Sequence, residues 1–358
     1  MLNIFAKKNL IGLDIGTSTV KIVELDEIKG KYKEKYKLKN LGVAKIPRET
    51  ISNGVIINAD PLVQAIKSLL SSLKITNKNA AVSVSGNNVI IKKITLPAMN
   101  ETELEKIIYS EAEQYIPFDL DEVNIDFQIL GANEENAELM DLMLVAAKKV
   151  NIQDYIDALN SAGIIAKIID IDVFALENMF SINYAQEENE VCVLVDIGAN
   201  ITNINIMKNG SSIFNRDALL GGNLITEEIQ KELLVSFEEA EMLKTGETIE
   251  GIDKELLDQT ISKTVSSITR EIQRTIDFFT GQTYTEITHI FLSGGSSRMH
   301  GLKEMLEDKY SGQVQFVDPF KSIKYDQKNF DAQYMDEIGP VAAISVGLAI
   351  RKAGVELK

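Results

Sequence analysis

The chain carries one short pattern twice, first near its start and again just past its middle. An apolar segment ending in Asp-Ile-Gly occurs at Ile11–Gly16 and at Val193–Gly198, and the two aspartates are 196 − 14 = 182 residues apart. In each copy a tight turn follows and leads into a second apolar segment typical of a β-strand. Two equivalent hairpins, one in each half, predict a duplicated α/β fold of two lobes with a cleft between them.

A third element points to the same chemistry. A predicted strand in the second half ends in Gly294-Gly295, which two unrelated hairpins would not explain. Glycine lets a backbone approach an anion closely, and the N–H groups of a turn point toward it. The hydroxyls of Thr17 and Ser18 add donors, and carboxylates such as Asp14 and Asp196 suit Mg²⁺ held through water. The pattern predicts a nucleoside triphosphate bound with Mg²⁺ between the lobes.

Length and charge narrow the class of protein. At about 100–200 residues per domain, 358 residues are enough for two lobes. The formal net charge is 37 − 53 = −16. This excess of acidic residues disfavours a nucleic-acid-binding protein, because cationic patches supply most of the affinity in such proteins. It also speaks against direct binding to an anionic membrane surface.

Other function classes are excluded by single residue types. Cys192 is the one cysteine and the chain has two histidines, so neither an intrachain disulfide nor a Cys/His zinc cluster can form. No apolar run reaches the roughly 18–20 residues of a membrane span. The first residues lack the pattern of a signal peptide. The sequence therefore predicts a cytoplasmic protein.

Local signals predict several element boundaries. The segment Val89–Lys148 has the order strand, helix, strand, strand, and Asn100 with Glu103 forms a capping box at the start of its helix. Asp60 and Asn151 are predicted to begin two further helices, one on either side of this segment. Gly221-Gly222 is predicted to open one helical stretch to about Lys244.

The motifs resemble those of the actin-like ATPase superfamily, in which two lobes clasp ATP between two phosphate-binding hairpins and an adenosine motif. Ile11–Lys21 and Val193–Ile206 resemble the two hairpins, and Ile290–Leu302 resembles the adenosine motif. Glu241 and Lys244 stand one helical turn apart and resemble the pair that the superfamily presents to ribose and adenine. The resemblance implies that ATP and Mg²⁺ are the cofactors, with Asp14 and Asp196 contacting the metal through water.

The residues expected to bind the nucleotide come from the hairpins, the diglycine, the Glu/Lys pair and the adenosine motif, where Arg298 resembles an arginine that flanks adenine. They are Asp14, Gly16, Thr17, Ser18, Lys21, Asp196, Gly198, Asn200, Gly221, Gly222, Glu241, Lys244, Gly294, Gly295, Ser296 and Arg298.

The inserted strand–helix–strand–strand segment selects a branch of the superfamily. It resembles the SHS2-type module that the division protein FtsA and the PilM family of type IV pilus assembly proteins carry in the first lobe. Ile116–Phe118, Asp172–Glu177 and Val317–Phe320 resemble the PilM family closely. The C-terminal membrane helix of FtsA has no counterpart after Ile350, so no direct membrane insertion is expected.

This resemblance implies a division of the chain into five ranges. They are the start of the first lobe at 1–88, the SHS2-type subdomain at 89–165, a connecting helix with the return of the first lobe at 166–190, the second lobe with its nucleotide-binding helical subdomain at 191–338, and a C-terminal helix returning to the first lobe at 339–358.

The resemblance also implies a function. A PilM-like protein is a scaffold of the type IV pilus, or of a type II secretion-like machine, and lies at the inner membrane through a partner. It binds the N-terminal cytoplasmic peptide of PilN in a groove beside the inserted module, which Ile116–Phe118 could help to line, and contacts the pilus motor ATPases. Weak self-association is compatible with this interpretation.

Catalysis is the open question. The superfamily orients the attacking water with Gln or Glu at the start of the helix that joins the lobes, and Asp172 holds that position here. Asp172 is shorter, and the favoured interpretation of it is a helix N-cap. The favoured interpretation is an ATP-binding scaffold with slow or no turnover. The alternatives are an FtsA-like polymerising ATPase and a small-molecule kinase.

Overall fold

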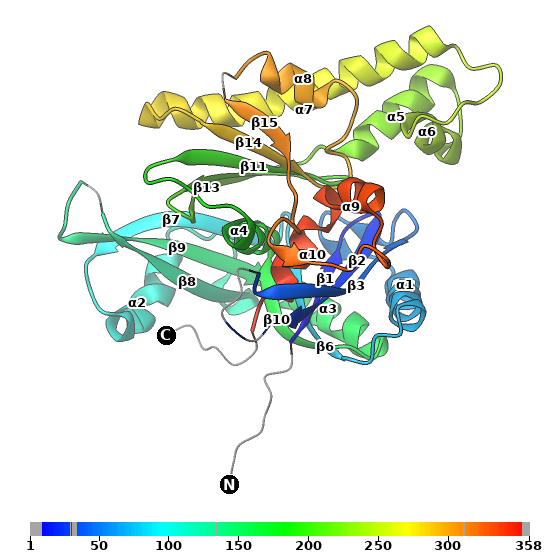
Figure 1. The fold of residues 1–358 in the computed structure, drawn as a ribbon. Helices are drawn as coiled ribbons and strands as arrows, with labels where there is room; N and C mark the ends of the chain where they lie inside the picture. Colours follow the sequence, from blue (N-terminus) through cyan, green and yellow to red (C-terminus); the bar gives the residue numbers. More distant parts are fainter. Residues whose placement is uncertain (1–8, 29, 31–33, 134, 311, 353–358) are drawn as a thin grey trace.

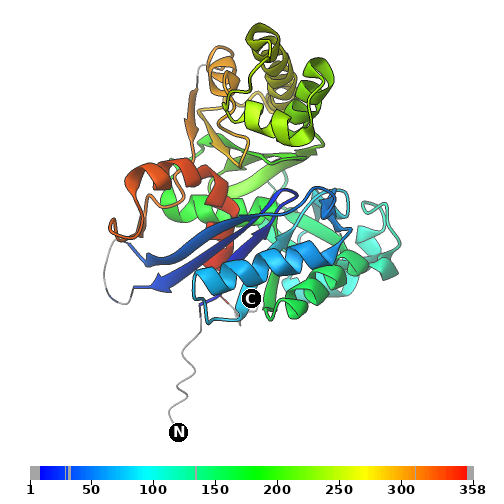
Figure 2. The ribbon, with the colours of Figure 1, turned by 90° about the vertical axis from the view of Figure 1, so that its right-hand side faces the viewer.

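The computed structural model describes residues 9–352 except 29, 31–33, 134 and 311, and its strands form three principal sheets (Figure 1). Two of the sheets belong to two lobes that lie one above the other, each with its own helices (Figures 1 and 2). This arrangement confirms the predicted two-lobed α/β fold. The outermost parts of the predicted ranges, 1–8 and 353–358, lie outside the described residues.

The sheet of the first lobe has the strand order β10-β6-β1-β2-β3-β16. Its centre is the antiparallel hairpin of β1 and β2, and β1 also pairs in parallel with β6. The strands are β1 (Ile11–Ile15), β2 (Thr19–Glu27), β3 (Tyr36–Lys45), β6 (Asn79–Val84), β10 (Ile165–Ile171) and β16 (Ile323–Lys324). A small ribbon of β4 (Ile51–Ser52) and β5 (Val55–Ile56) follows β3.

The sheet of the second lobe has the order β13-β12-β11-β14-β15. It repeats the first-lobe plan, because β11 and β12 form an antiparallel hairpin and β11 pairs in parallel with β14. The strands are β11 (Val191–Ile197), β12 (Thr202–Lys208), β13 (Ser211–Ala218), β14 (His289–Ser293) and β15 (Gln313–Phe316).

The two hairpins match residue by residue. The Gly16 N–H donates to the Thr19 carbonyl at 3.0 Å, and the Gly198 N–H donates to the Ile201 carbonyl at 2.9 Å. Both pairs of positions are offset by the same 182 residues that separate Asp14 from Asp196. The sequence repeat is thus a repeat of backbone geometry.

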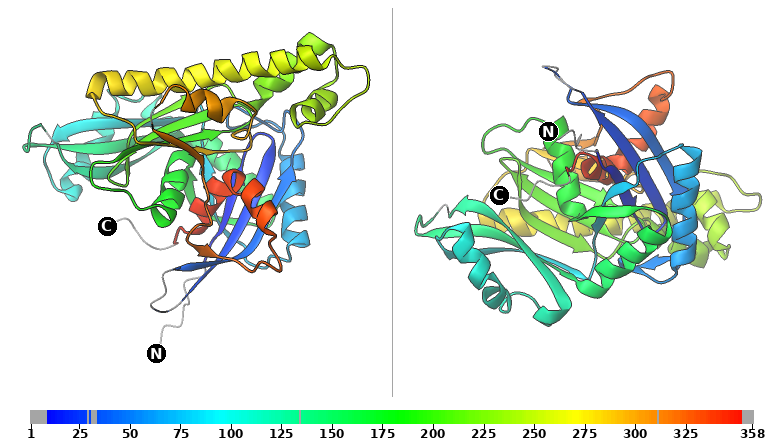
Figure 3. Two further views of the ribbon diagram at one scale, coloured as in Figure 1. Left: turned by 45° about the horizontal axis from the view of Figure 1, so that its top comes forward. Right: turned by 90° about the horizontal axis from the view of Figure 1, so that it is seen from below.

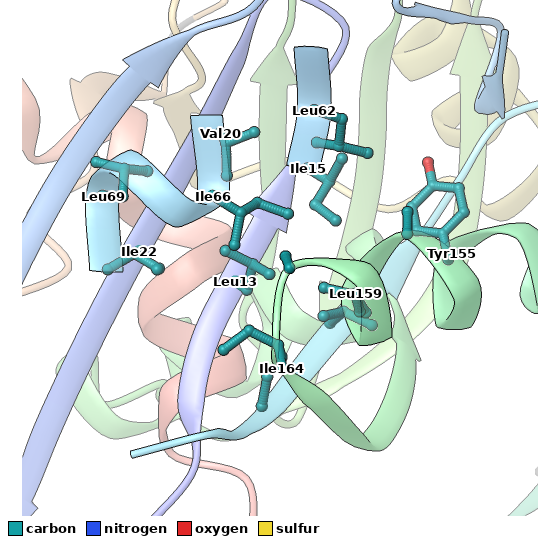
Figure 4. Close-up of a cluster of buried hydrophobic side chains, with 14 of the residues drawn as sticks. Leu13, Ile15, Val20, Ile22, Leu62, Ile66, Leu69, Tyr155, Leu159 and Ile164 are labelled. Atoms are coloured by element: carbon teal, nitrogen blue, oxygen red, sulfur yellow. The ribbon is translucent and has the colours of Figure 1, made fainter. Parts of the chain in front are cut away.

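The core of the first lobe lies between one face of the hairpin sheet and two helices, α1 (Ala59–Ser72) and α3 (Lys149–Ser161) (Figure 4). Leu13 and Ile22 from the sheet pack against Ile66 and Leu159 from the helices. Two predicted helix starts are wrong. Asn58, not Asp60, caps α1, and its side chain accepts from the Asp60 N–H.

Asn151 does not cap α3 either. The helix begins earlier, at Lys149, so Asn151 is buried within its first turn. Its side chain donates instead to the Gly54 carbonyl at 3.0 Å, in the turn between β4 and β5. Asn151 therefore stands at a sequence position typical of a helix cap, but its side chain makes a tertiary hydrogen bond instead.

Two helices lie between the sheets of the two lobes and join them. They are α4 (Asp172–Asn183) and α10 (Ala343–Ala349), and they pack against each other. Leu176 and Phe180 of α4 share one apolar cluster with Val23 and Leu25 of the first lobe and with other residues of both lobes. A short 3-10 turn, η2 (Pro340–Ala342), leads into α10, and α9 (Ala332–Ile338) precedes that turn.

The inserted module has a separate sheet of order β7-β9-β8, covered by α2 (Glu101–Ala112). Its strands are β7 (Val89–Pro97), β8 (Val123–Ala132) and β9 (Leu139–Lys148), with the 3-10 turn η1 (Leu120–Glu122) before β8. Asn100 and Glu103 form the predicted capping box at α2. The predicted range 89–165 is wider than this sheet, since α3 packs in the first-lobe core.

Four helices complete the second lobe: α5 (Gly222–Leu233), α6 (Phe237–Lys244), α7 (Lys254–Thr283) and α8 (Leu302–Glu307). The long α7 runs across the lobe in the views of Figure 3. The helical stretch predicted from Gly221 to Lys244 is divided. Leu234 takes a left-handed conformation with φ 57° and ends α5, and Ser236 begins α6 with a capping box.

The packing of α10 gives a direct test of this arrangement. A Cβ on Gly347 would lie 1.7 Å from the Ala175 carbonyl oxygen of α4, so the two helix backbones are in contact there. We expect Gly347→Ala to lower the free energy of unfolding by about 3 kcal/mol, because neither backbone can move away freely.

Gly281→Ala is the matched control, because Gly281 is also helical and nothing lies within 4 Å of its added Cβ. It should raise the free energy of unfolding by up to about 1 kcal/mol. Urea unfolding of both variants measures the difference. Equal stabilities would contradict the described packing of α10.

Candidate nucleotide-binding site

A buried ion pair lies in the first hairpin. Asp14 on β1 and Lys21 on β2 are directly opposite each other across the antiparallel pair, and the Lys21 Nζ lies 3.1 Å from an Asp14 carboxylate oxygen. Burial alone would lower the pKa of Lys21, but Asp14, and then Asp196 and Asp172, outweigh it and raise that pKa. The ammonium therefore stays charged in the field of three carboxylates from both lobes.

Asp172 faces this group from the start of α4. Ile171, rather than Asp172, is the N-cap residue, and no side chain makes a capping hydrogen bond. The N-cap interpretation of Asp172 is therefore wrong. Burial, followed by the charge of Asp14, raises the pKa of Asp172 to about 7, although the hydroxyls of Ser83 and Ser85 oppose the rise. Asp172 is thus an acidic residue in the first turn of α4 that makes no capping hydrogen bond and interacts electrostatically with Asp14.

Asp196 ends the corresponding strand of the second lobe. Its carboxylate accepts from the Ser293 hydroxyl at 2.8 Å, and these two residues are neighbours in the parallel register of β11 and β14. Burial raises the pKa of Asp196 to about 6, against the lowering effect of the Ser293 hydrogen bond, and Asp14 adds to the rise. Ser293 was not foreseen, although it precedes Gly294 at the end of the predicted strand.

Glycines allow other backbone segments to lie very close to the turn of the second hairpin. A Cβ on Gly221 would lie 2.5 Å from the Gly198 carbonyl oxygen, and one on Gly294 would lie 2.4 Å from the Ile197 carbonyl oxygen. Gly294 also has φ +90°, a conformation that L side chains rarely adopt. The Gly222 and Ser296 N–H groups donate to the carbonyls of Gly198 and Ile197. The structure thus brings the predicted diglycine and the start of the adenosine motif to the second hairpin.

The remaining turn residues differ in how they are held. Asn200 accepts at 2.6 Å from the side chain of Asn223, which sequence reasoning missed. Gly295 is exposed, and nothing would lie within 4 Å of an added Cβ. Thr17 and Ser18, in the turn of the first hairpin, are half-buried, and the Ser18 carbonyl accepts from the Ile46 N–H at 2.9 Å.

Glu241 and Lys244 form a compact polar cluster with α5. The Lys244 ammonium contacts Glu241 and donates to the Thr226 hydroxyl at 2.8 Å, and Thr226 in turn donates to Glu241. Lys244 also lies 3.4 Å from the Gly222 carbonyl oxygen. The pair is therefore joined to the diglycine helix instead of being a simple surface ion pair. Thr226 was missed, although it stands one turn after Gly222.

Arg298 is held by residues further along the chain. Its guanidinium donates to the carbonyl and carboxylate oxygens of Asp336 at 2.8 and 3.0 Å, and stacks on the Phe316 ring with its carbon 4.4 Å from the centroid. Among the described contacts, none joins Arg298 directly to the hairpins or to the Glu241–Lys244 cluster. An adenine-flanking role for Arg298 remains a prediction.

The paired hairpins and the buried carboxylates beside them define the class: this is a protein with the actin-like ATPase fold. The structure superposes with a TM-score of 0.50 on MreB 5 of Spiroplasma citri bound to AMPPNP, over 95% of this chain and 94% of that one at 13% identity. Cell division protein FtsA of Bacillus subtilis is 24% identical to this chain in an alignment of 398 positions, which covers 97% of this chain and 86% of FtsA.

The family described as Type IV pilus assembly protein PilM matches residues 12–353, so the chain belongs to the PilM family. A solved structure titled PilM-PilN type IV pilus biogenesis complex has a TM-score of 0.85 with this one and 28% identity, covering 96% of this chain and 98% of that chain. The chain is thus an actin-like protein of type IV pilus assembly.

The raised pKa of Asp172 makes stability depend on pH. An unfolded aspartate titrates near pH 3.9, whereas the pKa of Asp172 in the folded protein is about 7. The folded state therefore binds the proton more tightly, and this stabilisation is lost as the pH rises from about 4 to 7. We expect Asp172→Asn to raise the melting temperature at pH 8 by several degrees, and by less at pH 5.

Asp157→Asn, on the exposed face of α3, is the control and should shift neither temperature appreciably. Differential scanning calorimetry without nucleotide measures both. A gain for Asp172→Asn that is equal at the two pH values would show that the buried charge is not its cause.

Proposed function

We propose that this protein is an ATP-binding scaffold of the type IV pilus or type II secretion-like assembly platform. The observation that supports this most is the Lys21–Asp14 pair, enclosed with Asp172 and Asp196 between two glycine-lined hairpins from the two lobes. The turn amides of residues 16–18 and 198–200 would receive the phosphates, and the Glu241–Lys244 cluster would receive the ribose and adenine.

Charge balance makes Mg²⁺ a part of this proposal. Asp14, Asp172 and Asp196 together carry more negative charge than Lys21 can neutralise, and a polyphosphate adds several negative charges. Within the described ranges, no group of three or more His, Cys, Asp or Glu is close enough to hold a metal ion directly. Both facts favour a hydrated Mg²⁺ that Asp14 and Asp196 contact through water, because Mg²⁺ retains part of its hydration shell.

Mg-ATP should therefore stabilise the wild-type protein. A ligand at a hundredfold excess over its Kd adds about 2.7 kcal/mol to the free energy of unfolding. We expect a higher melting temperature with millimolar Mg-ATP, a much smaller rise with ATP and EDTA, and no rise for Asp14→Ala or Asp196→Ala. An unchanged wild-type melting temperature would contradict the proposal.

We propose that turnover is slow or absent. Asp172 is the candidate to orient water, but an aspartate reaches less far than the Glu or Gln that the superfamily uses. Phosphate release should stay below roughly one per minute, against an enzyme median of about 10 per second. Asp172→Asn should leave ATP binding intact. A fast wild-type rate that Asp172→Asn abolishes would make the protein an ATPase.

We propose, further, that the protein is recruited to the inner membrane by the N-terminal peptide of a PilN-type membrane protein, and that it contacts pilus motor ATPases. The similar structure that contains both PilM and PilN supports the first part. Within the described chain, no helix has the length and apolar character needed to cross a bilayer. An apolar groove or an open sheet edge could offset the cost of ordering such a peptide.

The inserted module is our candidate for the peptide site. Ile116 and Phe118 pack in its own core, so they do not identify the groove. The Lys148 N–H donates to the Asn88 carbonyl at 3.0 Å, so the chain enters and leaves the module at one place. Replacing residues 89–148 by a short Gly-Ser linker should abolish binding to liposomes that display the peptide, and should preserve Mg-ATP binding.

Bare anionic and neutral liposomes are the controls, and the wild-type protein should not sediment with them. Sedimentation with bare liposomes would contradict recruitment through a partner, and retained peptide binding after the replacement would exclude the module.

A polymerising ATPase is the second candidate, and the similarity to FtsA supports it. The two functions differ in a simple assay. A scaffold stays in the supernatant after ultracentrifugation with Mg-ATP, whereas a filament-forming protein sediments.

A further inference from the structure

One exposed arginine of the first lobe contacts two elements of the second lobe. The Arg48 guanidinium lies 2.5 Å from a Glu227 carboxylate oxygen on α5, and its carbon lies 4.8 Å from the centroid of the Phe237 ring on α6. Arg48 and Glu227 are 179 residues apart in the chain. The contact joins the segment after β3 to the helices that stand over it in Figures 1 and 3.

The segment that carries Arg48 is hydrogen-bonded to the first phosphate hairpin. The Ile46 N–H donates to the Ser18 carbonyl in the turn of that hairpin at 2.9 Å. The Thr50 N–H donates to the Pro47 carbonyl at 3.2 Å and closes a turn that presents Arg48. Arg48 thus lies two residues from a direct backbone contact with the turn that is proposed to hold the phosphates.

Glu227 and Phe237 are tied to the other side of the proposed site. Glu227 follows Thr226, which hydrogen-bonds within the Glu241–Lys244 cluster. Phe237 is the first residue of α6, one turn before Glu241. The two side chains that receive Arg48 thus stand on the helices that carry the candidate ribose- and adenine-binding residues.

We propose that Arg48, Glu227 and Phe237 form a latch that holds the two lobes closed over the nucleotide and opens for its release. This inference rests on the proposed nucleotide site. The cluster around α4 and α10 that joins the lobes is buried, whereas the latch residues are exposed or half-buried and exchange their contacts easily with water. Arg48 is then a positioning residue that sets how long nucleotide stays bound.

The strength of the contacts sets the expected effect. An exposed ion pair and an exposed cation–π contact are each weak, and each changes an equilibrium by a few-fold. Loss of both should speed nucleotide release by about tenfold. Salt should speed release from the wild-type protein, because the ion pair is screened, and should affect Arg48→Ala less.

Lobe closure can be measured without any nucleotide. Nitroxide labels on Lys67→Cys in α1 and Glu247→Cys after α6 report the distance across the cleft, and the native Cys192 is buried. We expect a narrow distance distribution in the otherwise wild-type protein. Arg48→Glu should broaden it toward longer distances, because Glu227 then repels the new carboxylate.

The charge swap Arg48→Glu with Glu227→Arg should restore the narrow distribution. Lys309→Glu is the matched control, because it breaks an exposed ion pair with Asp277 inside one lobe and should change nothing. Phe237→Leu keeps an apolar side chain without a ring and should broaden the distribution only partly.

Release of a fluorescent ATP analogue, chased with unlabelled ATP, gives the second measurement. Faster release from Arg48→Glu and recovery in the charge swap would support the latch. Unchanged distances and unchanged release rates in Arg48→Glu would overturn it. If the wild-type protein binds no nucleotide, the proposed function fails, whereas the distance measurement still decides whether Arg48 holds the lobes together.

Discussion

The buried Lys21 ammonium is the point on which the cleft depends. It is paired with Asp14 on the neighbouring strand, and Asp172 and Asp196 approach it from the interlobe helix and from the second lobe. Removing one partner of a buried ion pair leaves the other charge uncompensated, which costs several kcal/mol. Without Lys21, Asp14 would lose its cationic partner while Asp172 and Asp196 stay close, so this cation offsets the acidic groups gathered from both lobes.

The two duplicated hairpins keep the same backbone register and differ in their side chains. Asn203 occupies the position of Lys21 in the second hairpin, since 203 − 21 gives the same offset of 182. The Asn203 side chain donates to Asp217 at 2.5 Å, and Asp196 turns to Ser293. Each strand-end carboxylate therefore has its own partner, and of the two hairpins only the first carries a lysine at this position. In the proposed function, this asymmetry would orient the polyphosphate between the two hairpins.

The sequence predicted the parts of the fold that depend on neighbouring residues. The two hairpins and the capping box at Asn100 both follow from short-range spacing. The prediction that Asn151 caps α3 was wrong because its side chain donates to the carbonyl of Gly54, which is distant in the sequence. Leu234 divided a predicted helix because a left-handed leucine carries no sequence signal.

The candidate site was predictable to a similar extent and for the same reason. Glycine spacing indicated the turns, and the strand ends indicated the carboxylates. The partners of Arg298 were not predictable, because Asp336 and Phe316 reach it through tertiary packing. The contact between Arg48 and Glu227 spans the two lobes and was likewise invisible in the sequence. The structure therefore adds to the sequence prediction the contacts between segments that are distant in the chain.

The most direct test of the central claim is a crystal structure with Mg²⁺ and a non-hydrolysable ATP analogue. We predict that the phosphates contact the turns at residues 16–18 and 198–200, that Lys21 approaches a phosphate oxygen, and that waters join Mg²⁺ to Asp14 and Asp196. Phosphates bound outside the two hairpins, or density for the analogue on the surface alone, would contradict the account.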